Sequence, residues 1–112
     1  MKTALPERVR GVCCAVPIPL ERARASRSVE ILKALADPTR LQMVGILKGS
    51  EAPVCICDFT ATFKLSQPTI SHHIARLREA GLVDVVKEGL WAYYRLSGRL
   101  EPKTRALLDV LF

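Results

Sequence analysis

The sequence predicts a mainly α-helical fold that carries one β-hairpin in its C-terminal half. Two observations support this prediction. Apolar residues recur at spacings of three and four along several segments, which is the period of an amphipathic helix. Two short β-rich runs then flank a glycine-containing turn. With 112 residues, of which 49% are hydrophobic and 25% charged, the chain is expected to form one globular domain.

The N-terminal segment differs in pattern from the rest of the chain. Residues 1–19 contain three prolines and the pair Cys13-Cys14 but no sustained periodicity. We therefore expect a flexible arm there, which a ligand or a partner subunit would fix. Residues 20–112 are expected to form the folded domain.

Three helices are predicted in the first half of this domain. The first begins near Leu20, and its apolar residues follow the helical period. Asp37 is expected to cap the second helix, with Pro38 at its first position, and this helix stops near Gly49. A short third helix is predicted over Val54 to Phe63. The apolar positions expected in the first two helices are Val29, Ile31, Leu32, Leu35, Ala36, Leu41, Val44 and Leu47.

A fourth helix, a hairpin and a last helix complete the predicted domain. Ser66 is expected to cap the fourth helix, which ends at Gly81 and buries a stripe formed by Ile70, Ile74 and Leu77. The hairpin strands are predicted at Leu82 to Val86 and Trp91 to Leu96, with a last helix over Glu101 to Phe112. A short helix, a turn and a second helix followed by a hairpin make a winged helix-turn-helix.

The polar residues of the fourth helix are candidates for reading DNA. Short hydrogen-bonding side chains near a helix N-terminus suit base edges in a major groove, and the N-terminal amides favour phosphate. His72 and His73 point about 100° apart on a helix, so we expect one to contact DNA and the other to support packing. The predicted DNA contacts are Ser66, Gln67, Thr69, Ser71, His72, Arg76 and, in the hairpin, Lys87. Arg78 of this helix and Arg95 of the hairpin are expected to add positive charge.

The charge balance also favours a polyanionic partner. Lys and Arg outnumber Asp and Glu by 17 to 11, with an estimated isoelectric point of 9.5. Two copies at +6 each carry +12. An enzyme is not expected, because no glycine-rich anion cradle and no spacing that pairs a cysteine with a histidine is present.

The interpretation of the four cysteines depends on whether the protein lies in a reducing or an oxidising cellular compartment. The sequence has no run of 18 apolar residues and no secretory signal, so we expect a cytoplasmic protein without a membrane partner. Thiols stay reduced there. Cysteines are then more plausible as metal ligands or redox sensors than as structural disulfides.

Four segments in this order resemble the ArsR/SmtB family of metal-sensing repressors, over roughly Val29 to Leu96. The resemblance implies a homodimer joined through the first and last helices. It also implies a palindromic DNA operator, bound by the apo dimer and released when an inducer binds. The segments are Leu32 to Leu41, Val54 to Phe59, Leu65 to His73 with Leu77 to Leu82, and Glu88 to Arg95.

Within this resemblance, Cys55-Ile-Cys57-Asp58 is similar to the metal box of the family's arsenic, cadmium and lead sensors. A third cysteine is common three residues later, where this chain has Thr60. Cys13 and Cys14 are therefore candidates to complete the site, within the chain or across the dimer. Thiolates select soft ions. Arsenite or antimonite is the favoured inducer, cadmium or lead the alternative, and oxidation of arm and box thiols to a disulfide is a third interpretation.

The predicted third helix suggests a switch. Residues two apart on an α-helix point about 200° apart, so binding one ion through Cys55 and Cys57 should distort the start of that helix. The helix N-terminus is also expected to lower the pKa of these thiols. Two departures from the family stand out: Leu90 replaces a commonly basic residue at the hairpin tip, and the last helix lacks the residue pairs of the family's zinc site.

Overall fold

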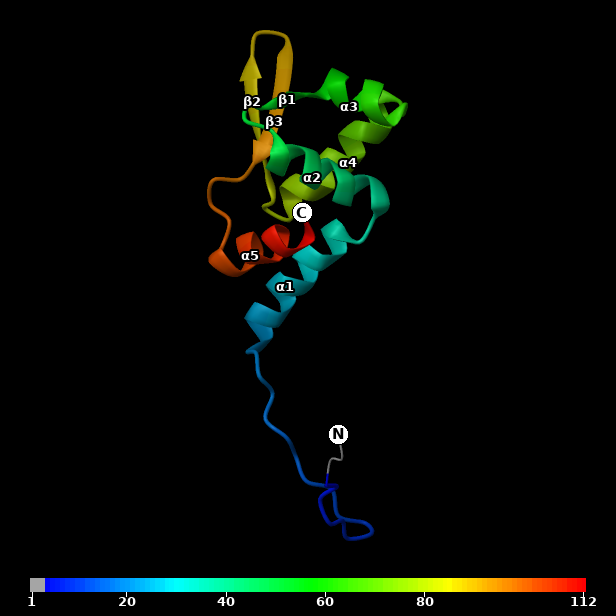
Figure 1. The fold of residues 1–112 in the computed structure, drawn as a ribbon, viewed down its shortest axis with the longest axis vertical. Helices are drawn as coiled ribbons and strands as arrows, with labels where there is room; N and C mark the ends of the chain where they lie inside the picture. The colour runs from blue at the N-terminus through cyan, green and yellow to red at the C-terminus, as the bar shows by residue number, and fades with distance from the viewer. Residues whose placement is uncertain (1–3) are drawn as a thin grey trace.

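The computed structural model describes residues 4–112, so residues 1–3 of the predicted arm lie outside the described residues. Residues 4–20 form an extended, exposed segment with one turn at its centre, where the Val12 amide donates to the Val9 carbonyl. This segment leads away from the body of the protein (Figure 1). It accounts for the elongated dimensions of the chain, 68 × 29 × 25 Å.

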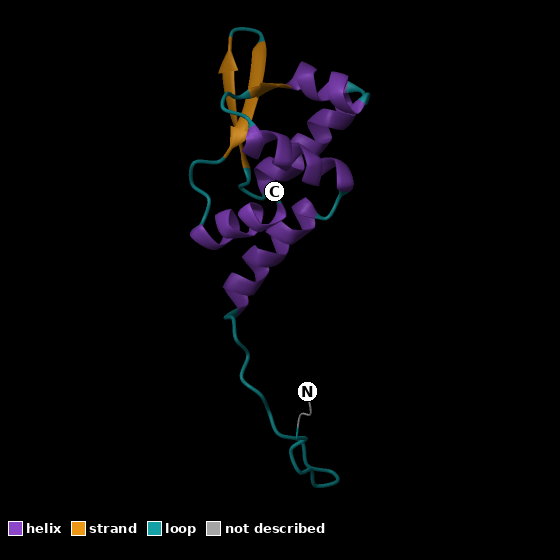
Figure 2. Cartoon of the chain, in the orientation of Figure 1, coloured by secondary structure: helices purple, strands orange, loops and turns teal. Residues whose placement is uncertain are grey.

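The described residues contain five helices and a small antiparallel sheet (Figures 1 and 2). The sheet has the strand order β1-β3-β2, and β2 and β3 form the wing, a hairpin that projects beyond the helices. No helix in residues 4–112 has the length and apolar character needed to cross a membrane. The elements are α1 (Arg22–Leu35), α2 (Pro38–Gly49), β1 (Val54–Cys55), α3 (Ile56–Phe63), α4 (Gln67–Glu79), β2 (Val83–Glu88), β3 (Trp91–Leu96) and α5 (Pro102–Leu111).

The core forms where α2, α4 and the sheet meet. The predicted stripe of α4 is confirmed, because Ile70, Ile74 and Leu77 are all buried. The first-helix pattern is confirmed only in part. Leu35 is buried, but Val29 and Leu32 are exposed on the outer side of α1. The core cluster also includes Ala34, Met43, Val44, Leu47, Phe59, Leu82, Val83, Tyr94 and Leu108.

Two element boundaries differ from the prediction. The third helix was predicted from Val54, but Val54 and Cys55 pair with Tyr94 and Tyr93 as strand β1, and α3 starts at Ile56. Lys87 was predicted in the hairpin turn, but it pairs with Ala92 inside the ladder. The wing turn is therefore only two residues long, and Gly89 provides its positive φ of 61°.

The ends of α2 and α4 follow the predicted capping. The Asp37 carboxylate accepts a hydrogen bond from the Arg40 amide at 2.9 Å, and Pro38 stands at the first helical position. At the end of α4, the amide of Leu82 donates to the Leu77 carbonyl, and Gly81 adopts a φ of 77°. This Schellman motif turns the chain directly into β2.

The Asp37 cap gives a prediction for the pH dependence of stability. The backbone hydrogen bond from Arg40 lowers the pKa of the Asp37 carboxyl below its usual 3.8. Stability from a lowered carboxyl pKa is present above the unfolded value and is lost as the pH falls through the folded value. Asp37→Ala should therefore cost about 1 kcal/mol near neutrality. Urea denaturation should show this difference shrinking in acid, and a difference that stays constant would contradict the assignment.

Gly45 on α2 gives a second prediction, because it lies directly beneath the Phe112 ring. A Cβ added at Gly45 would come within 2.5 Å of the ring carbon Cε1. Gly45→Ala should gain about 1 kcal/mol of helix propensity but displace the ring. In a Phe112→Ala background only the gain should remain. Thermal unfolding of the four proteins should give a coupling of about 1–3 kcal/mol between the two sites, and simple additivity would refute the contact.

Candidate nucleic-acid interface and thiol site

The N-terminus of α4 carries the predicted DNA-reading residues. Ser66 caps the helix by accepting a hydrogen bond from the Thr69 amide at 3.4 Å, and the two hydroxyls lie 2.9 Å apart. Gln67 is the first residue of the helix. Packing of α3 against α4 holds this end in place, with Phe59 almost completely buried and its ring stacked on Phe63. All seven residues that the sequence predicted as DNA contacts are exposed: Ser66, Gln67, Thr69, Ser71, His72, Arg76 and Lys87.

The helical period divides the exposed face of α4 into two edges. Thr69, His72 and Arg76 have the spacing i, i+3 and i+7. Arg76 lines a hollow together with Arg40, so this edge faces α1 and α2. By the helical period, Gln67 and Ser71 share the opposite edge with Arg78, which lines a hollow with β2 and β3, so we call this the wing-facing edge.

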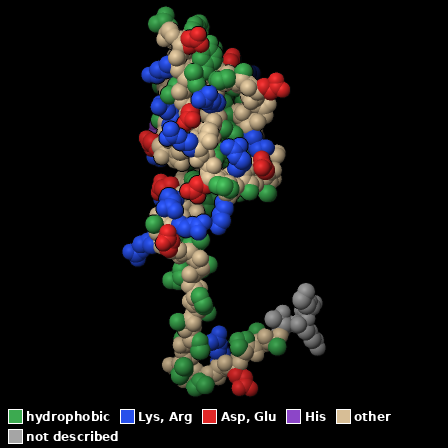
Figure 3. All heavy atoms as spheres, turned by 90° about the vertical axis from the view of Figure 1, so that its left-hand side faces the viewer, with side chains coloured by type: hydrophobic (Ala, Val, Ile, Leu, Met, Phe, Trp, Pro, Cys, Tyr) green, Lys and Arg blue, Asp and Glu red, His purple; other side chains and the backbone are tan. Residues whose placement is uncertain are grey.

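A second group of basic residues lies between α4 and the sheet, on the edge of Gln67 and Ser71. Two adjoining hollows share Asp84 and Arg95, which are directly opposite on β2 and β3. Arg78 of α4 lines one hollow, and Arg99 lines the other. We call Arg78, Arg95 and Arg99 the arginine groove. Figure 3 views the molecule from the left-hand side of Figure 1 and shows Lys and Arg side chains grouped over the body, with acidic side chains among them.

Sequence reasoning identified only part of this groove. Arg78 and Arg95 were expected to add positive charge, but Arg99 was missed because it follows β3 in a loop without a periodic pattern. At the tip of the wing, Leu90 is fully exposed, as is most of Trp91. Lys87 lies in strand β2, with Glu88 between it and the two-residue turn, and not in the turn itself.

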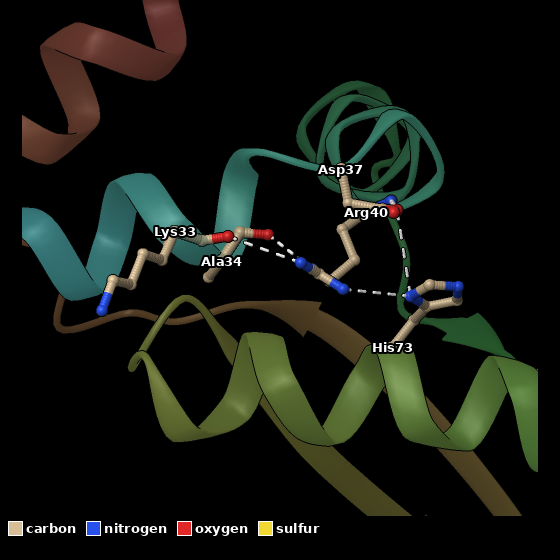
Figure 4. Close-up of polar contacts among 5 residues, drawn as sticks. All are labelled: Lys33, Ala34, Asp37, Arg40 and His73. Carbon is tan, nitrogen blue, oxygen red and sulfur yellow. Dashed lines mark hydrogen bonds and ion pairs between the residues drawn. The ribbon is translucent and has the colours of Figure 1, made fainter.

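The two adjacent histidines have different surroundings. The His72 ring is exposed on the face of α4, whereas His73 is half-buried. The Nδ1 atom of His73 lies 3.4 Å from Arg40 Nη1 and 3.9 Å from Asp37 Oδ2 (Figure 4). His73 thus packs against α2, as expected of one of the two histidines, and the DNA contact expected of the other stays a prediction for His72.

Cys55 and Cys57 form a preassembled sulfur pair. Cys55 is the N-cap residue of α3 with extended backbone angles and is buried, and Cys57 lies exposed in the first turn. Their Sγ atoms are 3.0 Å apart. The expectation that these side chains point about 200° apart was wrong, because Cys55 belongs to β1 rather than to the helix. The pair can bind one ion without unwinding α3, so the proposed distortion of that helix has lost its basis.

The pKa of the Cys57 thiol also differs from the expectation. The hydrogen bond to the Cys55 sulfur, followed by desolvation and the negative charges of Cys55 and Asp58, raises this pKa above its usual value. The Asp58 carboxylate lies 4.0 Å from the Cys57 sulfur. At neutral pH the Cys57 site therefore holds a thiol rather than a thiolate.

The structure does not bring the arm cysteines to this pair. Cys13 and Cys14 are exposed in the extended segment, which leaves α1 on the side away from α3 (Figure 1). Within residues 4–112, no group of three or more His, Cys, Asp or Glu side chains is placed to hold a metal ion. The predicted four-cysteine site is therefore present as two separate pairs.

Comparison with known proteins gives matches to transcriptional regulators. Residues 37–85 match the family described as "Bacterial regulatory protein, arsR family". The arsenical resistance operon repressor of Escherichia coli is 40% identical over 81 residues, which are 72% of this chain and 68% of that protein. An arsenic resistance transcriptional regulator of Pseudomonas putida is 42% identical over 78 residues, 70% of this chain and 60% of that protein.

Solved structures agree with the fold. HlyU from Vibrio cholerae superimposes with a TM-score of 0.70 at 30% identity, covering 81% of this chain and 94% of that one. A domain from Mycobacterium bovis, described as a homodimeric winged helix-turn-helix DNA-binding domain, gives a TM-score of 0.69 at 26% identity, with coverages of 88% and 89%. The winged helix-turn-helix prediction is confirmed, and these proteins are regulators rather than enzymes, as expected.

Proposed function

Because the chain belongs to the ArsR family of transcriptional repressors, we propose that it is an operator-binding homodimer that trivalent arsenic or antimony releases from DNA. The observation that carries the ligand proposal is the 3.0 Å separation of the Cys55 and Cys57 sulfurs. Arsenical resistance also appears in the names of the E. coli and P. putida relatives. Operator binding places this function in the cytoplasm, where the DNA lies.

The proposed DNA contacts divide between bases and phosphates. Gln67, Ser71 and His72 have side chains that suit base edges, and they extend from the first two turns of a capped helix whose inner stripe is buried. The arginine groove flanks the same helix and suits the phosphate backbone. Lys87 extends this positive surface along the wing.

We propose that α1 and α5 form the dimer interface. Both helices carry large apolar side chains that are exposed in the single chain. A dimer through these helices would remove them from water, and each such side chain is worth about 1.5–3 kcal/mol when fully buried. The exposed residues are Val29 and Leu32 on α1 and Val110, Leu111 and Phe112 at the end of α5.

The state of the thiols favours arsenite over a divalent cation. Three S–H groups condense with the three hydroxyls of As(OH)₃ to give three As–S bonds and three waters, so no proton is released. A Cd²⁺ or Pb²⁺ ion instead requires each ligand to lose its proton. The raised pKa of Cys57 makes that loss costly at neutral pH, but it does not oppose the condensation.

The third sulfur is proposed to come from Cys13 or Cys14. Arg22, the first residue of α1, lies eight positions after Cys14, and an extended segment of eight steps reaches roughly 26–29 Å. We propose that the arm folds back to bring this thiol to α3 of its own chain or of the partner. Mixed dimers, in which one chain lacks the arm thiols and the other lacks Cys57, distinguish the two. In such a dimer one chain keeps the Cys55–Cys57 pair and the other keeps the arm thiols. It responds to arsenite only if the arm of one chain reaches the sulfur pair of the other.

The pH dependence of release tests the ligand. The concentration of arsenite that releases half of the protein from a labelled duplex should stay constant between neutrality and mild acid. The corresponding cadmium concentration should rise, as the pH is lowered, by up to tenfold per pH unit for each proton that binding displaces. The assay needs a phosphine reductant, because dithiols bind arsenite. A steep arsenite curve would contradict the condensation, and a response to cadmium alone would establish the alternative inducer.

The same short sulfur–sulfur distance favours a second candidate function, a thiol redox switch. One molecule of peroxide would oxidise Cys55 and Cys57 to a disulfide with release of two waters. This reaction differs from the arm-to-box disulfide expected from the sequence. Release from DNA by peroxide without any response of the reduced protein to arsenite would establish it and exclude the arsenic proposal.

A further inference from the structure

We infer that Arg40 is a positioning residue that sets the orientation of the DNA-reading helix α4 relative to α1. This inference rests on the proposed operator binding. Figure 4 shows the Arg40 guanidinium between the last turn of α1 and His73 of α4. Its Nε atom donates to the Ala34 carbonyl at 2.7 Å, its Nη2 atom to the Lys33 carbonyl at 3.4 Å, and its Nη1 atom contacts His73 Nδ1 at 3.4 Å.

The chemistry of the groups defines the roles in this bridge. Ala34 and Lys33 lie in the last turn of α1, where carbonyls lack the partners they have further inside a helix, and the Lys33 carbonyl also accepts from the Ala36 amide at 3.3 Å. A guanidinium is a donor only, so Nδ1 of His73 is the acceptor in its contact with Arg40. Asp37 fixes the backbone of Arg40 at the start of α2. Its carboxylate caps α2 at Arg40 and lies 3.9 Å from the same Nδ1 atom.

A hollow beside the bridge separates α1 from α4, so polar contacts rather than apolar packing connect the two helices there. Glu30, Lys33, Arg40, Arg76 and Glu79 line it together with Ala34 and Ala80, between α1 and α4. Charged side chains thus border the gap where apolar packing would otherwise fix the spacing of the two helices. The Arg40 bridge spans this gap. Because His73 follows His72 directly, a small rotation of α4 at the bridge would move the proposed DNA-reading face.

Four variants, among them the double variant of Arg40→Gln and His73→Leu, and one control test the inference. Each is measured with a labelled duplex from the region upstream of the chain's own gene and with a scrambled duplex. Arg40→Gln and His73→Leu break the bridge. His73→Asn keeps an acceptor near the Nδ1 position. The control is Lys33→Gln, since only the backbone of Lys33 takes part. Dissociation constants are measured over a range of salt, with thermal unfolding to confirm that each protein is folded.

Positioning predicts a specific pattern. Arg40→Gln and His73→Leu should each weaken operator binding by about 3- to 30-fold, the range for substitutions that alter coupling between sites. The double variant should be no weaker than the worse single variant. His73→Asn and Lys33→Gln should bind nearly as the wild type does. Binding to the scrambled duplex and the salt dependence should not change.

The other outcomes overturn the inference. The salt slope is the slope of the logarithm of the binding constant against the logarithm of the salt concentration. If Arg40→Gln weakens binding to both duplexes equally and lowers the size of this slope by about one, Arg40 contacts phosphate directly. If His73→Asn is as impaired as His73→Leu, or if the two effects multiply, no bridge operates. Folded variants that bind like the wild type would show that the contacts serve stability only. Failure of the wild-type protein itself to bind the upstream duplex would instead refute the proposed function.

Discussion

Replacing Cys57 by serine should abolish the release of the protein from operator DNA by arsenite and leave DNA binding of the ligand-free protein unchanged. Cys57 is exposed in the first turn of α3, so its sulfur contributes nothing to the core. Losing an outer-shell partner already costs about 10- to 100-fold in metal affinity. Loss of a direct sulfur ligand should therefore raise the half-effective arsenite concentration by more than about 100-fold.

Cys57 is a better test than Cys55. Only 6% of Cys55 is exposed, and it pairs with Tyr93 in the sheet. A serine there would bury a hydroxyl, and the loss of stability would confuse the result. Fluorescence anisotropy of a labelled duplex, titrated with arsenite, measures the response. Normal release of the Cys57→Ser protein would remove the sulfur pair from the mechanism.

A cysteine at position 60 should restore the arsenite response to a chain that lacks the arm thiols. The Thr60 hydroxyl donates to the Cys57 carbonyl at 2.8 Å, so this side chain lies one turn after Cys57 on the same side of α3. A chain with Cys13→Ser and Cys14→Ser should lose the response. Adding Thr60→Cys should restore it, because a third sulfur then stands beside the pair. Failure of this rescue, with the response of the wild type intact, would mean that the ligand needs the arm for more than its sulfur.

The fold could be predicted where local pattern and tertiary packing agree. The stripe of α4 and its Ser66 cap are properties of a single segment, and each was found where the sequence indicated. The hairpin was found for the same reason, since a glycine turn between two β-rich runs is a local signal. In α1 the spacing of the apolar residues did not show which of them are buried. Leu35 lies in the core, whereas Val29 and Leu32 lie on an exposed face.

The four-cysteine site stays a prediction, and the geometry of its Cys55–Cys57 pair could not be predicted from the sequence. Nothing local to Val54 and Cys55 shows that they pair with Tyr94 and Tyr93, about 40 residues later in the chain. That pairing moves Cys55 out of the helix, brings the two sulfurs together and reverses the expected effect on the pKa of Cys57. The Arg40 bridge to His73 spans 33 residues and has no local signal either.

The second large effect is expected at the edge of α4 that faces the wing. Replacing both Gln67 and Ser71 by alanine should weaken operator binding by about 2–6 kcal/mol, since each base contact is worth about 1–3 kcal/mol. Alanine is a good helix former, so α4 should stay folded. Binding to a scrambled duplex should not change, because base contacts carry the sequence information and phosphate contacts do not.

The arginine groove should behave in the opposite way, and the contrast makes the prediction sharp. Alanine at both Arg78 and Arg95 should weaken binding to operator and scrambled duplex by the same factor and lower the salt slope by about two. Thr62→Ala is a suitable control, because Thr62 is exposed on α3 outside both surfaces. If the Gln67 and Ser71 variant weakens both duplexes alike, this edge does not read bases. Sequence recognition would then have to lie on the Thr69, His72 and Arg76 edge.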